Sequence, residues 1–253
     1  MRATSSTALR TTYAVWELTL QCNLGCIHCG SRAGAARASE LSTAEALRLV
    51  QQLAAAGIRE VTLIGGEAYL RADWLEIVAA IRRAGMSCSL TTGGLGISGA
   101  SAASMRKAGV QQVSVSIDGR ERTHDFQRGR LGSWSACFRT LALLKEARIP
   151  ITCNTQVNRL SAPELPLIYA DIREAKCRAW QVQLTVPMGR AADHPELLLQ
   201  PPELLDLFPL LSELADQAHR DGILFHAGNN IGYYGPFERR LRNGGNSGRA
   251  IWQ

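Results

Sequence analysis

The sequence lacks a long apolar run, a dense basic run and a secretory start. No segment of its 253 residues approaches the roughly 20 apolar residues that span a bilayer, and residues 1–13 are rich in Ser and Thr. The 28 Lys and Arg against 22 Asp and Glu give a net charge of +6, but the basic residues are scattered. This distribution does not indicate nucleic-acid binding. We therefore expect no nucleic-acid partner and no membrane partner.

The cysteines do not form the pattern of a disulfide framework. Their number is odd, at 7, and three of them crowd into eight positions as Cys22, Cys26 and Cys29. That pattern favours a reducing compartment and a cysteine-based metal site, so we expect a cytoplasmic protein. The other four are expected to be buried thiols that pack as small apolar residues: Cys88, Cys137, Cys153 and Cys177.

The rest of the chain alternates between strand-like and helix-like segments. Strands are expected over residues 13–20, 60–64, 87–92, 112–117, 151–157 and 180–186, with a seventh short one at 223–226. Helices are expected over residues 42–56, 73–84, 98–108, 133–147, 161–175 and 202–220. Capping boxes are expected at Ser42 with Glu45 and at Ser161 with Glu164. Six strand–helix units fit a doubly wound parallel sheet or a partial barrel, and both gather ligands at the carboxyl ends of the strands.

The cysteine triad follows the first expected strand as Cys-x3-Cys-x2-Cys. Three thiolates at this spacing can ligate three irons of a cubane cluster and leave the fourth iron open. The alternative is a zinc site with His28 as fourth ligand, but zinc sites usually pair two such hooks and His28 adjoins Cys29. The motif resembles the signature of the radical S-adenosylmethionine (SAM) superfamily, with His28 in place of the usual aromatic residue.

Later motifs resemble the SAM contacts of that family. Gly65-Gly66-Glu67, after the second expected strand, resembles the family's GGE motif, which binds the amino group of SAM. Ser116 lies in an S-x-D-G strand end, and the resemblance implies that it contacts SAM. Asp118 in the same motif either belongs to the site or caps the turn at Gly119. The sequence departs from the family at Gly93, where related sequences often have Asn.

Arg128 resembles an arginine that pairs with the SAM carboxylate, and a solvent-facing arginine is the alternative. Polar residues also alternate along the fifth and sixth expected strands, where they are costly to bury unless they line a cavity. Glu17 is either another cavity residue or a paired charge. The residues assigned to cofactor binding are Gly65, Gly66, Glu67, Ser116, Arg128, Asn154, Thr185, Met188 and His28, with Cys22, Cys26 and Cys29 as metal ligands.

The resemblance implies a partial (β/α)6 TIM-like barrel with parallel strands over residues 13–227. It also implies a [4Fe–4S] cluster and SAM as cofactors, and reductive cleavage of SAM to a 5′-deoxyadenosyl radical that abstracts a substrate hydrogen. An external electron donor of the flavodoxin or ferredoxin type is expected. Residues 1–12 are expected to be a flexible segment, and residues 228–253 a linker leading towards an auxiliary-cluster domain that the chain does not contain.

The turn that begins at Met188 and the Gly-, Asn- and Tyr-rich stretch from Gly228 resemble SPASM-type members of the family, which often modify ribosomally made peptides. Peptide modification is therefore the predicted activity. The alternatives are a radical SAM enzyme acting on a small molecule or a protein side chain, and a non-catalytic electron-transfer or SAM-binding module. The residues that act as catalytic acid or base are not assigned.

Overall fold

The computed structural model describes residues 12–228 and 231–243, and seven parallel strands form one sheet in these residues. The strands are β1 (Tyr13–Thr19), β2 (Glu60–Gly65), β3 (Ser87–Thr92), β4 (Gln112–Ser116), β5 (Ile151–Val157), β6 (Ala179–Leu184) and β7 (Leu224–Ala227). Each strand pairs with the next one in sequence. A doubly wound sheet would reverse its order part-way. The predicted partial barrel is therefore confirmed, and the expected short segment at 223–226 is its seventh strand.

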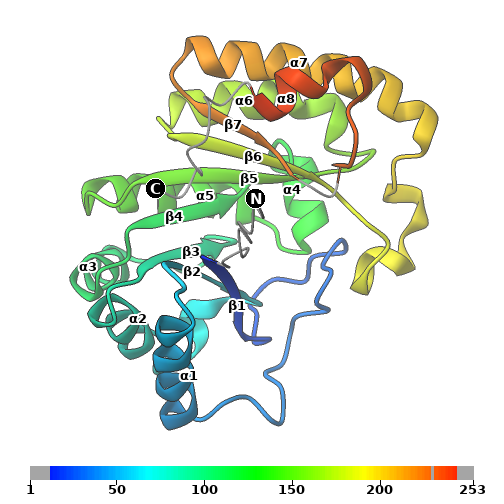
Figure 1. Cartoon of the computed structure of the whole chain (residues 1–253). Helices are drawn as coiled ribbons and strands as arrows, with labels where there is room; N and C mark the ends of the chain where they lie inside the picture. The colour runs from blue at the N-terminus through cyan, green and yellow to red at the C-terminus, as the bar shows by residue number, and fades with distance from the viewer. Residues whose placement is uncertain (1–11, 229–230, 244–253) are drawn as a thin grey trace, which may run out of the picture.

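The helices lie along the outside of the curved sheet, with α1 to α3 beside its first strands and α6 and α7 beside its last (Figure 1). The connecting α-helices are α1 (Thr43–Ala55), α2 (Trp74–Arg83), α3 (Gly99–Ala108), α4 (Glu121–Arg128), α5 (Ser133–Glu146), α6 (Leu165–Glu174) and α7 (Leu204–Arg220), and α8 (Glu238–Asn243) follows β7. Short 3-10 turns occupy Ala68–Leu70, Ala162–Glu164, Gly189–Asp193, Pro195–Leu197, Pro201–Glu203 and Gly235–Phe237. None of the described helices is long and apolar enough to cross a membrane.

Helix α4 was not expected from the sequence. Its residues carry one large apolar side chain, Phe126, and that side chain is 63% exposed. The buried face of α4 consists instead of His124, Asp125, Gln127 and Arg128. An apolar period of 3.6 residues is therefore absent, and periodicity could not reveal this helix.

The two expected capping boxes had different outcomes. The Ser42–Glu45 box is present at the start of α1. The Ser161–Glu164 box was wrong, because the Ser161 hydroxyl accepts from the Asn158 backbone N at 2.9 Å. The Glu164 carboxylate accepts instead from Arg120 N at 2.6 Å and Thr123 Oγ1 at 2.7 Å. This glutamate thus ties the chain after β4 to the start of α6.

Alternation along the strands separates an apolar outer face from a polar inner face. Leu63, Leu90 and Val115 are buried in the apolar core. Polar residues alternate with them on the inner face, and some of these bond to one another, as Thr62 Oγ1 does with Ser89 Oγ at 2.6 Å. The four single cysteines are free and buried, as predicted: Cys88, Cys137, Cys153 and Cys177.

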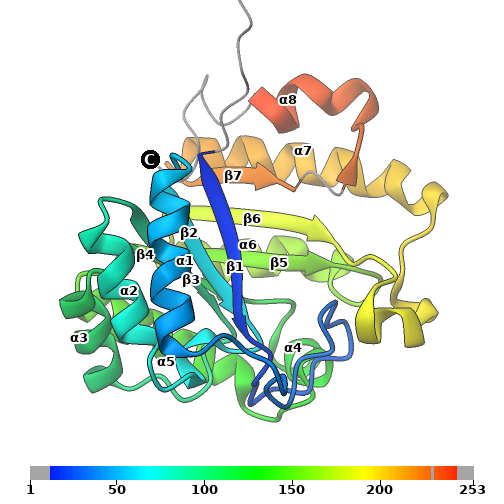
Figure 2. The same cartoon turned by 60° about the horizontal axis from the view of Figure 1, so that its bottom comes forward.

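The loop after β1, helix α4 and the segment after β6 gather beyond the carboxyl ends of the strands (Figure 2). At the other end of the chain, residues 231–243 fall in the stretch expected to be a linker. Ile231, Tyr234 and Leu241 are nevertheless buried in the core, and α8 packs on α7 and β7. This part of the stretch is therefore folded onto the barrel. Residues 1–11, 229–230 and 244–253 lie outside the described residues.

Candidate functional site

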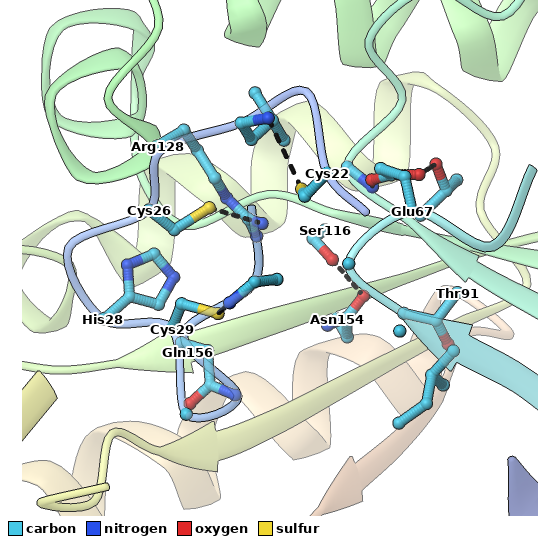
Figure 3. A pocket seen from close by; sticks show the side chains of 18 of the residues that line it. Cys22, Cys26, His28, Cys29, Glu67, Thr91, Ser116, Arg128, Asn154 and Gln156 are labelled. Atoms are coloured by element: carbon cyan, nitrogen blue, oxygen red, sulfur yellow. Dashed lines mark hydrogen bonds between the residues drawn. The ribbon is translucent and has the colours of Figure 1, made fainter. Parts of the chain in front are cut away.

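One cavity at the carboxyl ends of the strands brings most of the predicted site residues together (Figure 3). Its walls come from the loop after β1, from β2 to β5, from α4 and from the segment after β6. The predicted residues that line it are Cys22, Cys26, His28, Cys29, Gly65, Gly66, Glu67, Ser116, Arg128 and Asn154. Its position agrees with the rule that ligands of parallel α/β folds bind at the carboxyl ends of the strands.

Each of the three cysteine sulfurs of this loop has an N–H donor close to it. The Sγ of Cys22 lies 3.4 Å from Leu24 N, and the Sγ of Cys29 lies 3.4 Å from Ala33 N. The Sγ of Cys26 lies 3.7 Å from a guanidinium nitrogen of Arg128. Donors of this kind stabilise a thiolate, which is the form that ligates iron.

Arg190 fixes the loop from the opposite side of the barrel. Its Nε donates to the Cys26 carbonyl oxygen at 2.6 Å, and its Nη1 donates to the Ala33 carbonyl oxygen at 2.9 Å. The backbone N–H of Arg190 also donates to the Cys29 carbonyl oxygen at 2.8 Å. A residue more than 150 positions away thus holds the triad in place.

Burial makes two of these sulfurs, those of Cys22 and Cys26, costly to ionise without a cationic partner. It raises the pKa of Cys22 to about 11, and it also raises the pKa of Cys26, although Arg128 acts in the opposite direction. Within residues 12–228 and 231–243, no three His, Cys, Asp or Glu side chains converge on a point that could hold one metal ion. The zinc alternative finds no support, and the Nε2 of its fourth ligand, His28, is 2.9 Å from Asp118. Thiolates of a cubane bind different irons and need not converge on one point.

Gly65 and Gly66 allow the end of β2 to approach the start of the cysteine loop. Gly65 has a φ of 154°, and a Cβ there would overlap the Thr19 carbonyl oxygen. A Cβ on Gly66 would overlap the Gln21 carbonyl oxygen and lie 2.6 Å from that of Leu20. The backbone therefore requires glycine at both positions.

The Glu67 carboxylate lies at the end of β3. It accepts from Thr92 Oγ1 at 2.7 Å and from Gly93 N at 2.5 Å. Burial raises the pKa of Glu67 to about 7, although both hydrogen bonds lower it. At Gly93, where the sequence departs from the family, a Cβ would overlap a terminal methyl of Leu24 and lie 2.9 Å from Glu67 Oε1, so a larger residue would require these two side chains to shift.

Asp118 does not cap the turn at Gly119, so that alternative was wrong. Its carboxylate is 0% exposed, lies 2.9 Å from His28 Nε2 and forms an ion pair with Arg128 Nη2 at 2.5 Å. Arg128 is 8% exposed, so the solvent-facing alternative was wrong as well. Burial raises the pKa of Asp118, but Arg128 and His28 outweigh it and hold this pKa well below its usual range. The expected pairing of Arg128 with a SAM carboxylate stays a prediction.

Asn154 is central to the polar floor of the cavity. Its Oδ1 accepts from Ser114 Oγ at 3.2 Å and from Ser116 Oγ at 3.1 Å.

Two predicted residues do not line the cavity. Thr185 is buried and its hydroxyl accepts from Asn158 Nδ2 at 3.3 Å, whereas Met188 is 60% exposed.

Glu17 is a paired charge, since it forms an ion pair with Arg37 and accepts from Ser31 Oγ at 2.5 Å. Four polar residues of the cavity wall were not assigned from the sequence: Thr91, Thr92, Gln156 and Arg190. Gln156 alternates with Asn154 on one strand, and that alternation could have identified it. Arg190 carries no comparable signal.

A family model described as the radical SAM superfamily matches residues 16–158. The chain belongs to this superfamily. AdoMet-dependent heme synthase of Oleidesulfovibrio alaskensis is 36% identical over 179 residues, which cover 70% of this chain and 46% of that protein. The sporulation killing factor maturation protein SkfB of Bacillus subtilis is 30% identical over 177 residues, covering 70% of this chain and 43% of that protein.

Solved structures share the fold. Streptococcus suis SuiB bound to S-adenosylmethionine matches with a TM-score of 0.74 at 15% identity, covering 86% of this chain and 50% of that one. Native anSMEcpe with bound AdoMet and Kp18Cys peptide matches with a TM-score of 0.70 at 16% identity, covering 85% of this chain and 63% of that one. At these identities the likeness establishes the architecture and no more.

The radical SAM chain spans about half the length of the curated relatives it matches. Membership of this superfamily implies SAM and a [4Fe–4S] cluster as the cofactors of the chain. The named relatives are a heme synthase, a maturation protein and a probable GTP cyclase. The relatives include peptide-modifying proteins, in line with the subgroup recognised from the sequence.

Proposed function

We propose that Cys22, Cys26 and Cys29 ligate three irons of a [4Fe–4S] cluster and that SAM binds beside it in the cavity. The observation that carries this proposal is the shared wall, on which the three sulfurs, the glycine pair, Glu67 and Ser116 line one space. The donor set fits the cluster, because burial makes Cys22 and Cys26 costly to ionise without a compensating cation, and each of the three sulfurs has one N–H donor.

When bound, the cluster would pass one electron from the external donor to SAM, and SAM would supply a 5′-deoxyadenosyl group able to abstract a hydrogen atom from the substrate. The chain itself positions the reactants and excludes water. The Glu67 carboxylate and the backbone carbonyls at the end of β2 suit an ammonium group. Ser116 and Asn154 supply the hydroxyl and amide that a ribose needs. Thr185 and Met188, which lie outside the cavity wall, remain candidates for contact with a larger bound ligand.

The substrate we propose is a ribosomally made peptide. Support comes from SkfB and from the PqqA peptide cyclase of Methylocella silvestris, which is 31% identical over 148 residues covering 58% of this chain. The chain covers only 40% of that cyclase, so the proposal concerns an activity that residues 13–227 would contribute as a core domain. An external flavodoxin- or ferredoxin-type donor and a cytoplasmic location complete the proposal.

A second candidate substrate is an iron porphyrin. Heme synthases of three organisms match at 34% to 36% identity, and Fe-coproporphyrin III synthase of Methanosarcina barkeri matches at 33% over 163 residues. These identities are higher than those of the peptide-modifying relatives, so this candidate is tested beside the first.

The test compares the two substrate classes, peptide and iron porphyrin, in separate incubations. The reconstituted enzyme is incubated anaerobically with SAM, a reductant and either candidate precursor peptides from short reading frames neighbouring its gene or iron–coproporphyrin III. A mass change of the peptide that rises in step with 5′-deoxyadenosine supports the proposal. A mass change of the porphyrin, with the peptide unaltered, would transfer the proposal to the second candidate.

A further inference from the structure

The buried carboxylate of Asp118 joins the cysteine loop to helix α4. Its Oδ2 is 2.9 Å from His28 Nε2 and 2.5 Å from Arg128 Nη2. Its Oδ1 accepts from Gln156 N at 2.8 Å. His28 lies between two of the cluster cysteines in sequence, and Arg128 is the last residue of α4. One carboxylate therefore holds together two elements that are about 100 residues apart in the chain.

Arg128 extends this connection to a sulfur. Its Nη1 lies 3.7 Å from Cys26 Sγ, while its Nη2 faces Asp118. The same guanidinium is thus shared between a carboxylate and a cluster thiol. Both groups are negative when Cys26 ligates iron, so the charge of Arg128 is divided between them.

The backbone reinforces this contact on both sides of Cys26. Gly25 N donates to the Arg128 carbonyl oxygen at 3.0 Å, and Ile27 N donates to the Gln127 carbonyl oxygen at 2.9 Å. Gly129, which ends α4 with a φ of 60°, lies so close that a Cβ would be 2.6 Å from the Gly25 carbonyl oxygen. The end of α4 and the cysteine loop are therefore packed backbone against backbone, and Arg128 has little freedom to move away.

We propose that Asp118 acts on the cluster through Arg128, whose positive charge it partly offsets beside Cys26. The backbone contacts of α4 keep the Arg128 guanidinium in place, and the balance of the two charges sets the reduction potential of the cluster. The inference rests on the proposed binding of a cluster by the three cysteines. Hydrogen bonds to the sulfurs and the net charge nearby are established determinants of such potentials. His28, in the place of an aromatic residue, is the second group that the carboxylate holds.

The two charges are expected to act in opposite directions. A positive charge near the cluster stabilises the added electron and raises the potential, and a negative charge lowers it. Asp118→Asn keeps the side-chain shape but removes the negative charge, so the midpoint potential should become less negative. Arg128→Gln removes the positive charge and leaves Asp118 in place, so the potential should become more negative. A general loosening of the site would not produce shifts of opposite sign.

Removing one partner of a buried ion pair can prevent folding, and Arg128→Gln carries this risk. The double variant with Asp118→Asn and Arg128→Gln removes both charges and leaves none unpaired. It should have a more negative potential than Asp118→Asn alone, which isolates the contribution of Arg128 even if the single arginine variant does not fold. Asp171→Asn is the matched control, because Asp171 pairs with Arg120 at 2.7 Å outside the cavity.

The measurement is a redox titration of the reconstituted chain followed by electron paramagnetic resonance, with iron per chain determined for each variant. A less negative potential in Asp118→Asn, reversed in the double variant and absent in Asp171→Asn, supports the inference. An unshifted potential in Asp118→Asn at full iron content overturns it, as does loss of iron from both Asp118→Asn and the double variant. Failure of the wild-type chain to hold a cluster would instead refute the proposed function.

Discussion

Glu67 should make the stability of the folded chain depend on pH, and Glu67→Gln should remove that dependence. In the unfolded chain the carboxyl has its ordinary pKa of 4.5, and in the folded chain burial raises the pKa to about 7. Between these values the folded chain keeps a proton that the unfolded chain releases. Raising the pH through this range therefore draws the chain towards the unfolded state.

The size of the effect follows from the two pKa values. One pKa unit is worth about 1.4 kcal/mol, so the difference between 4.5 and about 7 corresponds to about 3 kcal/mol lost between pH 4 and pH 8. Glutamine can keep both contacts, because its amide oxygen can accept from Gly93 N and its amide nitrogen can donate to Thr92 Oγ1. The variant should thus gain stability relative to the wild type as the pH rises.

The assay is urea unfolding of the cofactor-free chain, under reducing conditions, from pH 5 to pH 8. The quantity of interest is the difference in unfolding free energy between Glu67→Gln and the wild type at each pH, because other titrating groups cancel in that difference. Glu213→Gln, on the exposed face of α7, is the control and should follow the wild type. A difference that stays constant with pH would refute the raised pKa of Glu67.

Three further predictions concern the supporting structure. Gly65→Ala should lower the unfolding free energy by more than about 2 kcal/mol, because the new Cβ would overlap the Thr19 carbonyl oxygen. Gly34→Ala is the control and should change the unfolding free energy by less than about 0.5 kcal/mol, because nothing lies within 4 Å of its Cβ. Equal effects would contradict the close approach of β1 and β2. Leu63→Ala, in the fully buried centre of β2, should cost about 2–5 kcal/mol in the same unfolding assay, and a loss under about 1 kcal/mol would contradict the packing described. Cys137→Ala should keep the full iron content after reconstitution, because the Cys137 thiol donates to the Gly93 carbonyl oxygen and lies outside the cavity wall. Loss of iron from this variant would show that Cys137 is a further ligand.

The architecture was largely predictable because each strand and helix carries its own local pattern. The order of the strands was not, since periodicity fits both a doubly wound sheet and a barrel, and only the resemblance favoured the barrel. Helix α4 was missed because its buried face is polar. The burial of this polar face depends on partners such as Asp118 and the cysteine loop, and these lie outside the sequence of α4 itself.

The candidate site shows the same division. The cysteines, the glycine pair and Ser116 were found from short motifs, and they line one cavity. The pairing of Asp118 with His28 and Arg128 was not foreseen, because it joins residues from three separate elements and forms no motif of fixed spacing in the sequence. The hydrogen bond from Arg190 Nε to the Cys26 carbonyl oxygen was not predicted for the same reason.

The central claim is that the three cysteines support reductive cleavage of SAM. It is tested most directly by anaerobic reconstitution with iron and sulfide, followed by incubation with SAM and dithionite and quantification of 5′-deoxyadenosine. The wild-type chain should bind about four irons and form 5′-deoxyadenosine, and Cys26→Ala should lose that product. A fully reconstituted wild-type chain that forms no 5′-deoxyadenosine, or a Cys26→Ala chain that forms as much as the wild type, would contradict the claim.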